Sequence, residues 1–411
     1  MDRGAGRLPR AVPLLMAVRF ARSIGQGALV VGFTLYLHAL GWGAARIGAL
    51  LSGALLVAVL LTLLVGPASD RMGRRSFLLG YEVVVLFSST LALLSSSPWV
   101  LTVGALLGGF GRGANGSAGP FGPLEQAWLA QDLQPAQRAR VFSLNAALGF
   151  GGMALGALLG ALPAAWRHEL PGALAFRPLF VLPLLGSLIG LSLLLRAREG
   201  AVPAAGAMSA QRGAAAAVDP PASQQNRLLL RLAIANSLNG MGIGLVAPWM
   251  AYWYALRFGH GPASIGPALA AGFVCAALGA QLARRLSQRV GLVDAVVYMR
   301  AVGLALLLLT PLSPWFALAA IAWAVRSAFN RGTVGVRQAL VVGLTDERRR
   351  GLAATVNNVS VMLPRAIGPA LSGLMLARGW LVAPFLVAAL FQGAYLVAYR
   401  GFFAGLSAAR P

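Results

Sequence analysis

Arginines and carboxylates inside long apolar segments are the residues of this chain that could do chemistry. The arginines that fall near the middle of such segments are Arg112, Arg326, Arg331 and Arg365. The acids within or beside apolar segments are Glu82, Glu125 and Asp294. Charges at that depth are costly unless they are paired or face a cavity. The positive excess therefore predicts an anion-binding site for a carboxylate or phosphate, and arginines bonded only to the carbonyls of broken helices are the alternative.

Nothing in the sequence indicates a catalytic or metal centre. Cys275 is the single cysteine, and it lies in an apolar segment. The histidines His38, His168 and His260 form no ligand pattern with it. Because no nucleophile, base and metal-ligand set comes together, we expect no enzyme activity, no cofactor and no metal site.

The elements that must position these charges are membrane-spanning helices. The chain is 58% hydrophobic and 11% charged, whereas soluble domains average about 25% charged residues. Twelve apolar segments are long enough to cross about 30 Å of hydrocarbon. They are residues 14–39, 46–66, 76–96, 98–119 (with 131 as an alternative end), 141–163, 177–196, 228–256, 262–283, 292–312, 314–343, 352–376 and 381–403.

The formal net charge of +23 resembles that of a nucleic-acid-binding protein until the basic residues are placed. All 34 are arginine, of which 22 fall in loops on one side of the expected membrane and 5 on the other. This positive-inside distribution predicts a multi-pass protein of the bacterial inner membrane with both termini in the cytoplasm. It excludes a nucleic-acid partner and favours contact of the inner face with anionic lipid.

The second half of the sequence repeats the first. Gln126-Ala127, Asn145 and Gly156 match Gln338-Ala339, Asn357 and Gly368 at an offset of 212, and Ser69, Arg71 and Gly73 match Ser287, Arg289 and Gly291 at an offset of 218. The repeat predicts two six-helix bundles, residues 1–196 and 228–411, with the site at their interface. Residues 197–227 are rich in Ala, Pro and Gly and are expected to form a flexible cytoplasmic linker.

Glycine and proline interrupt the fourth and tenth segments at corresponding positions, around residues 108–120 and 326–335. Breaks in corresponding helices of two repeats point to a transport site, and close packing through small residues is the alternative. The predicted substrate-contacting residues are Arg112, Asn115, Arg326, Asn330, Arg331, Gln26, Asn239 and Asn357. Interhelical hydrogen bonds are the alternative for the amides, and Arg19 and Arg22 are expected to reach the inner interface by snorkelling.

A charged stretch between the second and third segments carries the most specific pattern, G-x-x-x-D-R-x-G-R-R over residues 66–75. It resembles the loop between the second and third helices of the major facilitator superfamily of transporters. The resemblance implies an all-α membrane fold of twelve helices in two pseudo-symmetric bundles. It also implies gating or coupling roles for Gly66, Asp70, Arg71, Gly73 and Arg74, with Glu125 as the expected partner of Arg71 or Arg74. A charged loop that only fixes topology is the alternative.

Two further motifs are similar to parts of that family. Residues 112–116 resemble its fourth-helix R-x-x-x-G motif, which is associated with proton transfer, and residues 119–127 and 336–339 resemble a bacterial multidrug-type efflux branch. However, Ala157 stands where drug/proton antiporters carry a proline, and the first segment has no acid. The resemblance implies a monomeric secondary active transporter that works by alternating access, namely a proton-coupled exporter of a small organic molecule, with anions among the candidates. An importer or facilitator of a metabolite anion, and a membrane sensor or lipid-handling protein, are the alternatives.

Overall fold

Helices make up almost all of the described chain. The computed structural model describes residues 8–113, 115–131, 133–199, 222–337 and 350–407, without the side chains of 66–68, 70–72, 135, 136, 139, 222–224, 350–355 and 405–407. Within this part of the chain, ten helices are long and apolar enough to cross a membrane. This confirms the predicted all-α membrane fold.

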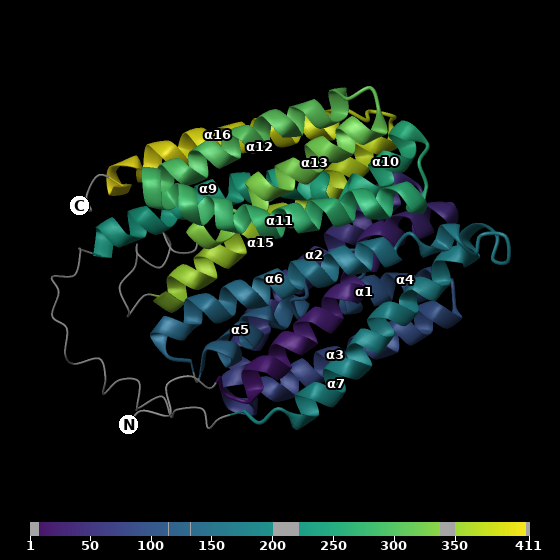
Figure 1. Ribbon diagram of the computed structural model, residues 1–411, viewed down its shortest axis with the longest axis horizontal. Helices are drawn as coiled ribbons and strands as arrows, with labels where there is room; N and C mark the ends of the chain where they lie inside the picture. The colour runs from purple at the N-terminus through teal and green to yellow at the C-terminus, as the bar shows by residue number, and fades with distance from the viewer. Residues whose placement is uncertain (1–7, 114, 132, 200–221, 338–349, 408–411) are drawn as a thin grey trace.

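The first half of the chain contributes α1 (Ala11–Ala39), α2 (Ala44–Met72), α3 (Arg74–Leu94), α4 (Pro98–Val103), α5 (Gly122–Gln131), α6 (Pro135–Leu159) and α7 (Val181–Arg196). The second half contributes α9 (Ala222–Val246), α10 (Met250–Phe258), α11 (Pro262–Val290), α12 (Leu292–Leu312), α13 (Phe316–Arg331), α15 (Arg350–Ala377) and α16 (Ala383–Ser407). Figure 1 shows the two halves as two adjacent groups of helices, purple to teal and green to yellow.

Two further crossings are not among these ten long helices, and they are the two whose sequences predicted a break. The fourth consists of α4, a π-helical turn at Gly104–Gly108, an irregular stretch, a 3-10 turn at Gly119–Phe121 and then α5. Positive φ angles, which favour glycine, recur through this stretch at Gly109, Gly111, Gly113, Asn115, Gly116 and Gly119. The tenth crossing, α13, ends at Arg331 after 16 residues and is followed by a turn at 332–333. With these two, the fold has the twelve crossings that the sequence predicted.

The charged stretch at residues 66–75 is mostly helical, so the expectation of a ten-residue loop is wrong. Helix α2 continues to Met72 and α3 begins at Arg74, which leaves Gly73 as the only non-helical residue between them. Its φ of 79° requires glycine. Gly291, at φ 89°, forms the same joint between α11 and α12. The repeat is therefore visible in the backbone.

Packing inside the two groups also repeats. A Cβ atom on Gly27 would collide with the backbone oxygen of Met153, and one on Gly244 would collide with that of Arg365. These two contacts join α1 to α6 and α9 to α15. Gly27 and Gly244 differ by 217 residues, which sets the offset between α1 and α9. Met153 and Arg365 differ by 212 residues, which is the offset that the sequence repeat also gives for α6 and α15.

Between the groups, α2 packs on α15 and α6 packs on α11. The backbone N–H of Ala370 donates to Ser52 Oγ at 2.8 Å, and His38 meets Tyr252 edge to face with ring centroids 5.1 Å apart. Gly48 lies so close to Gly373 that a Cβ on it would be 3.1 Å from the Gly373 Cα. The close contacts involve the first half of α2 and the second half of α15, so the groups meet tightly at this end.

Candidate functional site

A buried ion-pair cluster lies within the first group of helices. We call Arg19, Arg22, Glu82 and Glu125 the N-terminal polar cluster. Arg22 of α1 donates from Nε to Glu82 Oε1 at 3.0 Å and from Nη1 to Glu125 Oε2 at 2.8 Å. Its Nη1 also donates to the carbonyl of Gly116 in the broken fourth crossing at 2.8 Å. Arg22 thus joins α1, α3, α5 and the break.

The N-terminal polar cluster corrects two expectations. Arg19 and Arg22 are 8% and 4% exposed, so they do not snorkel to the interface. Glu125 pairs with Arg22 and not with Arg74, whose guanidinium donates to Gln131 at 3.3 Å. The side chain of Arg71, the other expected partner, lies outside the described residues. Each carboxylate has one buried oxygen without a hydrogen-bond partner among the described residues, Glu82 Oε2 and Glu125 Oε1. These oxygens are where a proton could bind.

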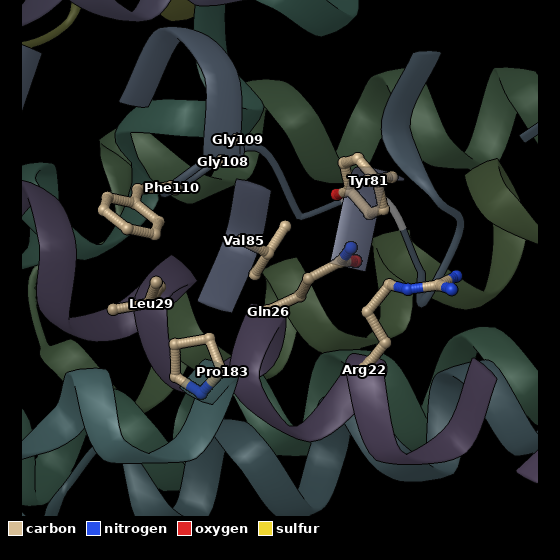
Figure 2. A pocket seen from close by; sticks show the side chains of 10 residues that line it. Arg22, Gln26, Leu29, Tyr81, Val85, Gly108, Gly109, Phe110 and Pro183 are labelled. Carbon is tan, nitrogen blue, oxygen red and sulfur yellow. The ribbon is translucent and has the colours of Figure 1, made fainter. Parts of the chain in front are cut away.

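A small cavity lies beside this cluster, as Figure 2 shows. It is bounded by Arg22 and Gln26 of α1, Tyr81 of α3, Pro183 of α7 and residues 108–111 of the break. Its volume of about 20 Å³ suits one water molecule and is far below the several hundred Å³ of a drug-sized site. Gln26, a predicted substrate contact, binds the break through its amide: it donates to the carbonyl of Ser117 at 3.0 Å and accepts from the N–H of Gly116 at 2.9 Å.

Arg112 and Asn115 lie in the break itself. The Nη1 and Nη2 atoms of Arg112 are buried and have no hydrogen-bond partner among the described residues, and neither has the Asn115 side-chain oxygen. The Arg112 guanidinium lies against Gly109, so a side chain at that position, whose φ is positive, would have to push the guanidinium aside. The break therefore places one uncompensated positive charge next to the N-terminal polar cluster.

A second cluster occupies the corresponding place in the other group of helices. We call Asn236, Asn239, Arg300 and Arg337 the C-terminal polar cluster. Arg300 of α12 donates to Asn239 Oδ1 at 2.9 Å, to Gln392 Oε1 at 3.3 Å and to Thr333 Oγ1 at 3.1 Å. Arg337 donates to Asn236 Oδ1 at 3.1 Å. The described partners of both arginines are neutral.

The two clusters are related by the repeat, with their charges changed. At the offsets given above, Arg19 and Arg22 correspond to Asn236 and Asn239, Glu82 corresponds to Arg300, and Glu125 corresponds to Arg337. Two arginines and two carboxylates in the first half are thus replaced by two amides and two arginines in the second. Glu82 and Arg22 were not predicted as site residues; the match of Glu82 with Arg300 at offset 218 was the signal that could have found them.

Three further arginines gather near the interface between the two groups. Arg326 is 5% exposed and stacks on Trp323, with its guanidinium carbon 4.7 Å from the ring centroid. Arg331 stacks on Phe273 at 5.0 Å. Arg326 is repelled by Arg300 of the C-terminal polar cluster and by Arg331, and Arg331 is repelled by Arg365. Arg326 Nε, Arg365 Nε and Asn330 Oδ1 are buried without a hydrogen-bond partner among the described residues.

A cavity of about 20 Å³ opens beside Arg331. It is bounded by Val30 of α1 on one side and by Met250, Phe273, Trp323 and other residues of the second group on the other. It is therefore shared by both halves, as the repeat predicted for a transport site. Its walls are mostly apolar and aromatic.

The remaining predicted residues have structural partners or lie outside the description. Asn239 bonds Arg300, and Asn357 accepts from Asn236 Nδ2 at 2.9 Å, so both make interhelical hydrogen bonds. The side chains of Asp70 and Arg71 lie outside the described residues, and at Gly66 only the helical backbone is described. The backbone N–H groups of Arg74 and Arg75 donate to Glu199, which thereby caps the start of α3.

Twelve crossings in two related groups, with buried charges at their centre and a cavity between them, define a membrane-embedded secondary transporter. The chain matches the family model of the Major Facilitator Superfamily over residues 15–227 and 232–407. It belongs to that superfamily, and it is a multi-pass membrane transporter rather than an enzyme.

Individual relatives are more distant. Multidrug resistance protein MdtH of Cronobacter sakazakii is 28% identical over 161 residues, covering 36% of this chain and 39% of the relative. Uncharacterized membrane protein YJR124C of Saccharomyces cerevisiae is 28% identical over 150 residues, covering 36% of this chain and 33% of the relative. The matched part thus spans about a third to two fifths of these relatives. The crystal structure of a D-xylose-proton symporter superimposes with a TM-score of 0.73 at 15% identity, over 95% of this chain and 97% of the other, which shows the shared fold.

Proposed function

We propose that this transporter is a proton-coupled exporter of a small organic anion, located in the bacterial inner membrane as a monomer with cytoplasmic termini. The observation that carries the substrate class is a chain of three neighbouring arginines, buried Arg326 and half-buried Arg331 and Arg365, in which Arg331 repels both others. An anion that enters the neighbouring cavity offsets this repulsion. A cation would add to it.

The walls of the shared cavity narrow the substrate class. Phe273 and Trp323 stack on arginines, and Met250 and Val30 add apolar surface. An organic acid with an apolar or aromatic body fits such a lining better than a fully hydrated inorganic ion. The cavity holds about one water, so binding requires the two groups of helices to move apart around it, as in alternating access.

The N-terminal polar cluster supports the proton-coupling part of the proposal. Glu82 and Glu125 meet at the guanidinium of Arg22, and each leaves one oxygen without a hydrogen bond from the described residues. Repulsion between the two carboxylates favours uptake of a proton by one of them, against the attraction of Glu125 to Arg19. Arg112, unpaired in the adjacent break, adds a positive charge that opposes protonation and could link it to substrate occupancy. The name of the MdtH relative favours export as the direction.

The first test is ligand-induced thermal stabilisation of the purified protein by organic anions, lipophilic cations and neutral compounds. We expect stabilisation by anions, lost in Arg331→Ala and Arg326→Ala and retained in Arg285→Ala, which removes an exposed arginine of α11. Stabilisation by cations that survives in Arg331→Ala would overturn the anion assignment.

Coupling and direction are tested with the anion found in that screen. Proteoliposomes of known orientation are given a pH gradient, and both anion flux and internal pH are followed. We expect anion export to drive proton entry in the wild type and to lose its dependence on the gradient in Glu125→Gln and Arg112→Ala. Unchanged flux in Arg112→Ala with the gradient collapsed would refute coupling through this residue.

A further inference from the structure

The C-terminal polar cluster places two positive charges close together, one buried (Arg300) and one half-buried (Arg337). Arg300 is 3% exposed, and its described hydrogen-bond partners are two amides and a hydroxyl. The guanidinium carbons of Arg300 and Arg337 lie 5.3 Å and 5.7 Å from the centroid of the same ring, that of Tyr395. Neutral amides offset part of the cost of burying these charges but leave their mutual repulsion.

Two phenol groups next to these arginines lack partners. The hydroxyl oxygens of Tyr395 and Tyr399 are buried and have no hydrogen-bond partner among the described residues. The two side chains are 0% and 3% exposed, and their ring centroids are 5.3 Å apart. Tyrosine hydroxyls are usually hydrogen-bonded when they are buried. Two O–H donors without partners beside two arginines form a set suited to a negatively charged hydrogen-bond acceptor.

The first half of the molecule shows what the same positions contain when the charge is balanced. There, Glu82 and Glu125 occupy the places of Arg300 and Arg337, and they neutralise Arg22. In the described part of the second half, Asp294 is the only acid. It lies in the first turn of α12, about 9 Å along the helix axis from Arg300. The described second half thus has no carboxylate that corresponds to Glu82 or Glu125 of the first half.

We propose that the C-terminal polar cluster, together with Tyr395 and Tyr399, binds one small inorganic anion of the halide type. Arg300 and Arg337 supply the charge, and the phenols supply additional O–H donors. The enclosure of these groups favours a small, weakly hydrated ion over sulfate or phosphate, because the ion must give up its water. None of these residues lines the proposed substrate cavity beside Arg331, although Arg300 lies close enough to Arg326 to repel it. The proposed anion site does not depend on the direction or substrate of transport.

The test uses the purified full-length chain with chloride as the probe. Thermal unfolding is followed while chloride replaces gluconate at constant ionic strength, and bound radioactive chloride is counted at equilibrium. In the wild type we expect the unfolding temperature to rise by several degrees, with binding that saturates near one chloride per chain. Exposed Arg285→Gln, on α11, is the control and should behave like the wild type.

Two variants separate the proposal from a merely structural role. Arg300→Gln should lose chloride binding but also loses hydrogen bonds. Arg337→Glu restores the acid that the first half carries at this place, so it should pair with Arg300, abolish chloride binding and leave the chloride-free protein at least as stable as the wild type. Tyr399→Phe should weaken binding about 10-fold, equivalent to about 1.4 kcal/mol.

The proposal is overturned if the wild type shows no saturable chloride binding, or if Arg337→Glu retains it in full. It is also overturned if chloride has no effect and either Asp346→Asn or Glu347→Gln destabilises the protein strongly. In that case a carboxylate of the chain, and not a bound ion, would balance the cluster.

Discussion

The N-terminal and C-terminal polar clusters occupy equivalent places in two copies of one helix arrangement, yet one is neutral and the other positive. Glu82 bonds Arg22 in the first, and Arg300 bonds Asn239 in the second. The glycine contacts that hold α1 on α6 and α9 on α15 are the same in both. The comparison shows that the shared helix packing determines where the polar side chains of each half meet, whereas the charges of those side chains differ between the halves. Function in this fold therefore has to be argued from the site.

The largest expected effect comes from removing one carboxylate of the neutral cluster. Glu82→Gln leaves Arg22 buried with half of its counter-charge, and we expect a loss of about 3–5 kcal/mol in unfolding free energy. Exposed Glu169→Gln is the matched control. Thermal unfolding in detergent measures both. If Glu82→Gln were as stable as Glu169→Gln, the ion pairs would not hold this cluster together.

A second prediction tests whether the packing of the two halves is really shared. A Cβ on Gly156 would collide with the backbone of Ile24, and one on Gly368 with the backbone of Gly244. Because backbone cannot move aside easily, we expect Gly156→Ala and Gly368→Ala to cost about 3 kcal/mol each, at the upper end for overpacking. Thermal unfolding of the two variants should show equal shifts. A large effect in one half alone would break the equivalence.

Removing an amide from the C-terminal polar cluster should lower the free energy of unfolding by less than the preceding changes. Asn239→Leu removes an acceptor from buried Arg300, and we expect a loss of about 2 kcal/mol. The double variant Asn239→Leu/Arg300→Leu should be more stable than Asn239→Leu alone, because it no longer leaves the charge unsatisfied. Additive losses in this thermodynamic cycle would show that Asn239 acts only through packing.

The smallest effect is expected at the helix starts. The carboxylate of Glu199 accepts from the N–H groups of Arg74 and Arg75 at the start of α3, whereas α12 carries Asp294 in its own first turn. Glu199→Gln should cost about 0.3–1 kcal/mol. The loss should shrink as salt is raised, because the charge is partly exposed. A salt-independent loss would point to hydrogen-bond geometry alone.

Much of this architecture could be read from the sequence because it depends on local properties. Apolar length defines the crossings, and Gly73 and Gly291 mark the joints between helices. The interruptions in the fourth and tenth crossings follow from glycine content, and they appear where expected. These features depend on short stretches of chain, which sequence reasoning handles well.

The pairing inside the clusters could not be read in this way. Arg22, Glu82 and Glu125 are distant in sequence, and only helix rotation and the course of the broken segment decide which of them meet. The sequence therefore predicts that Arg22 snorkels to the inner interface and that Glu125 pairs with Arg71 or Arg74. The repeat contained more information than was used, since the offsets that align the two halves also align Glu82 with Arg300 and Glu125 with Arg337.

The ion pairs of Arg22 have a consequence for how the chain enters the membrane during synthesis. Helix α1 is made first and carries Arg19 and Arg22, each of which costs about 2.5–3.5 kcal/mol at the centre of a lone inserted helix. The carboxylate partners of Arg22 lie on α3 and α5, which are translated later. We therefore expect the insertion machinery to retain α1 until those helices emerge, so that the first half enters the lipid as an assembled unit and not helix by helix.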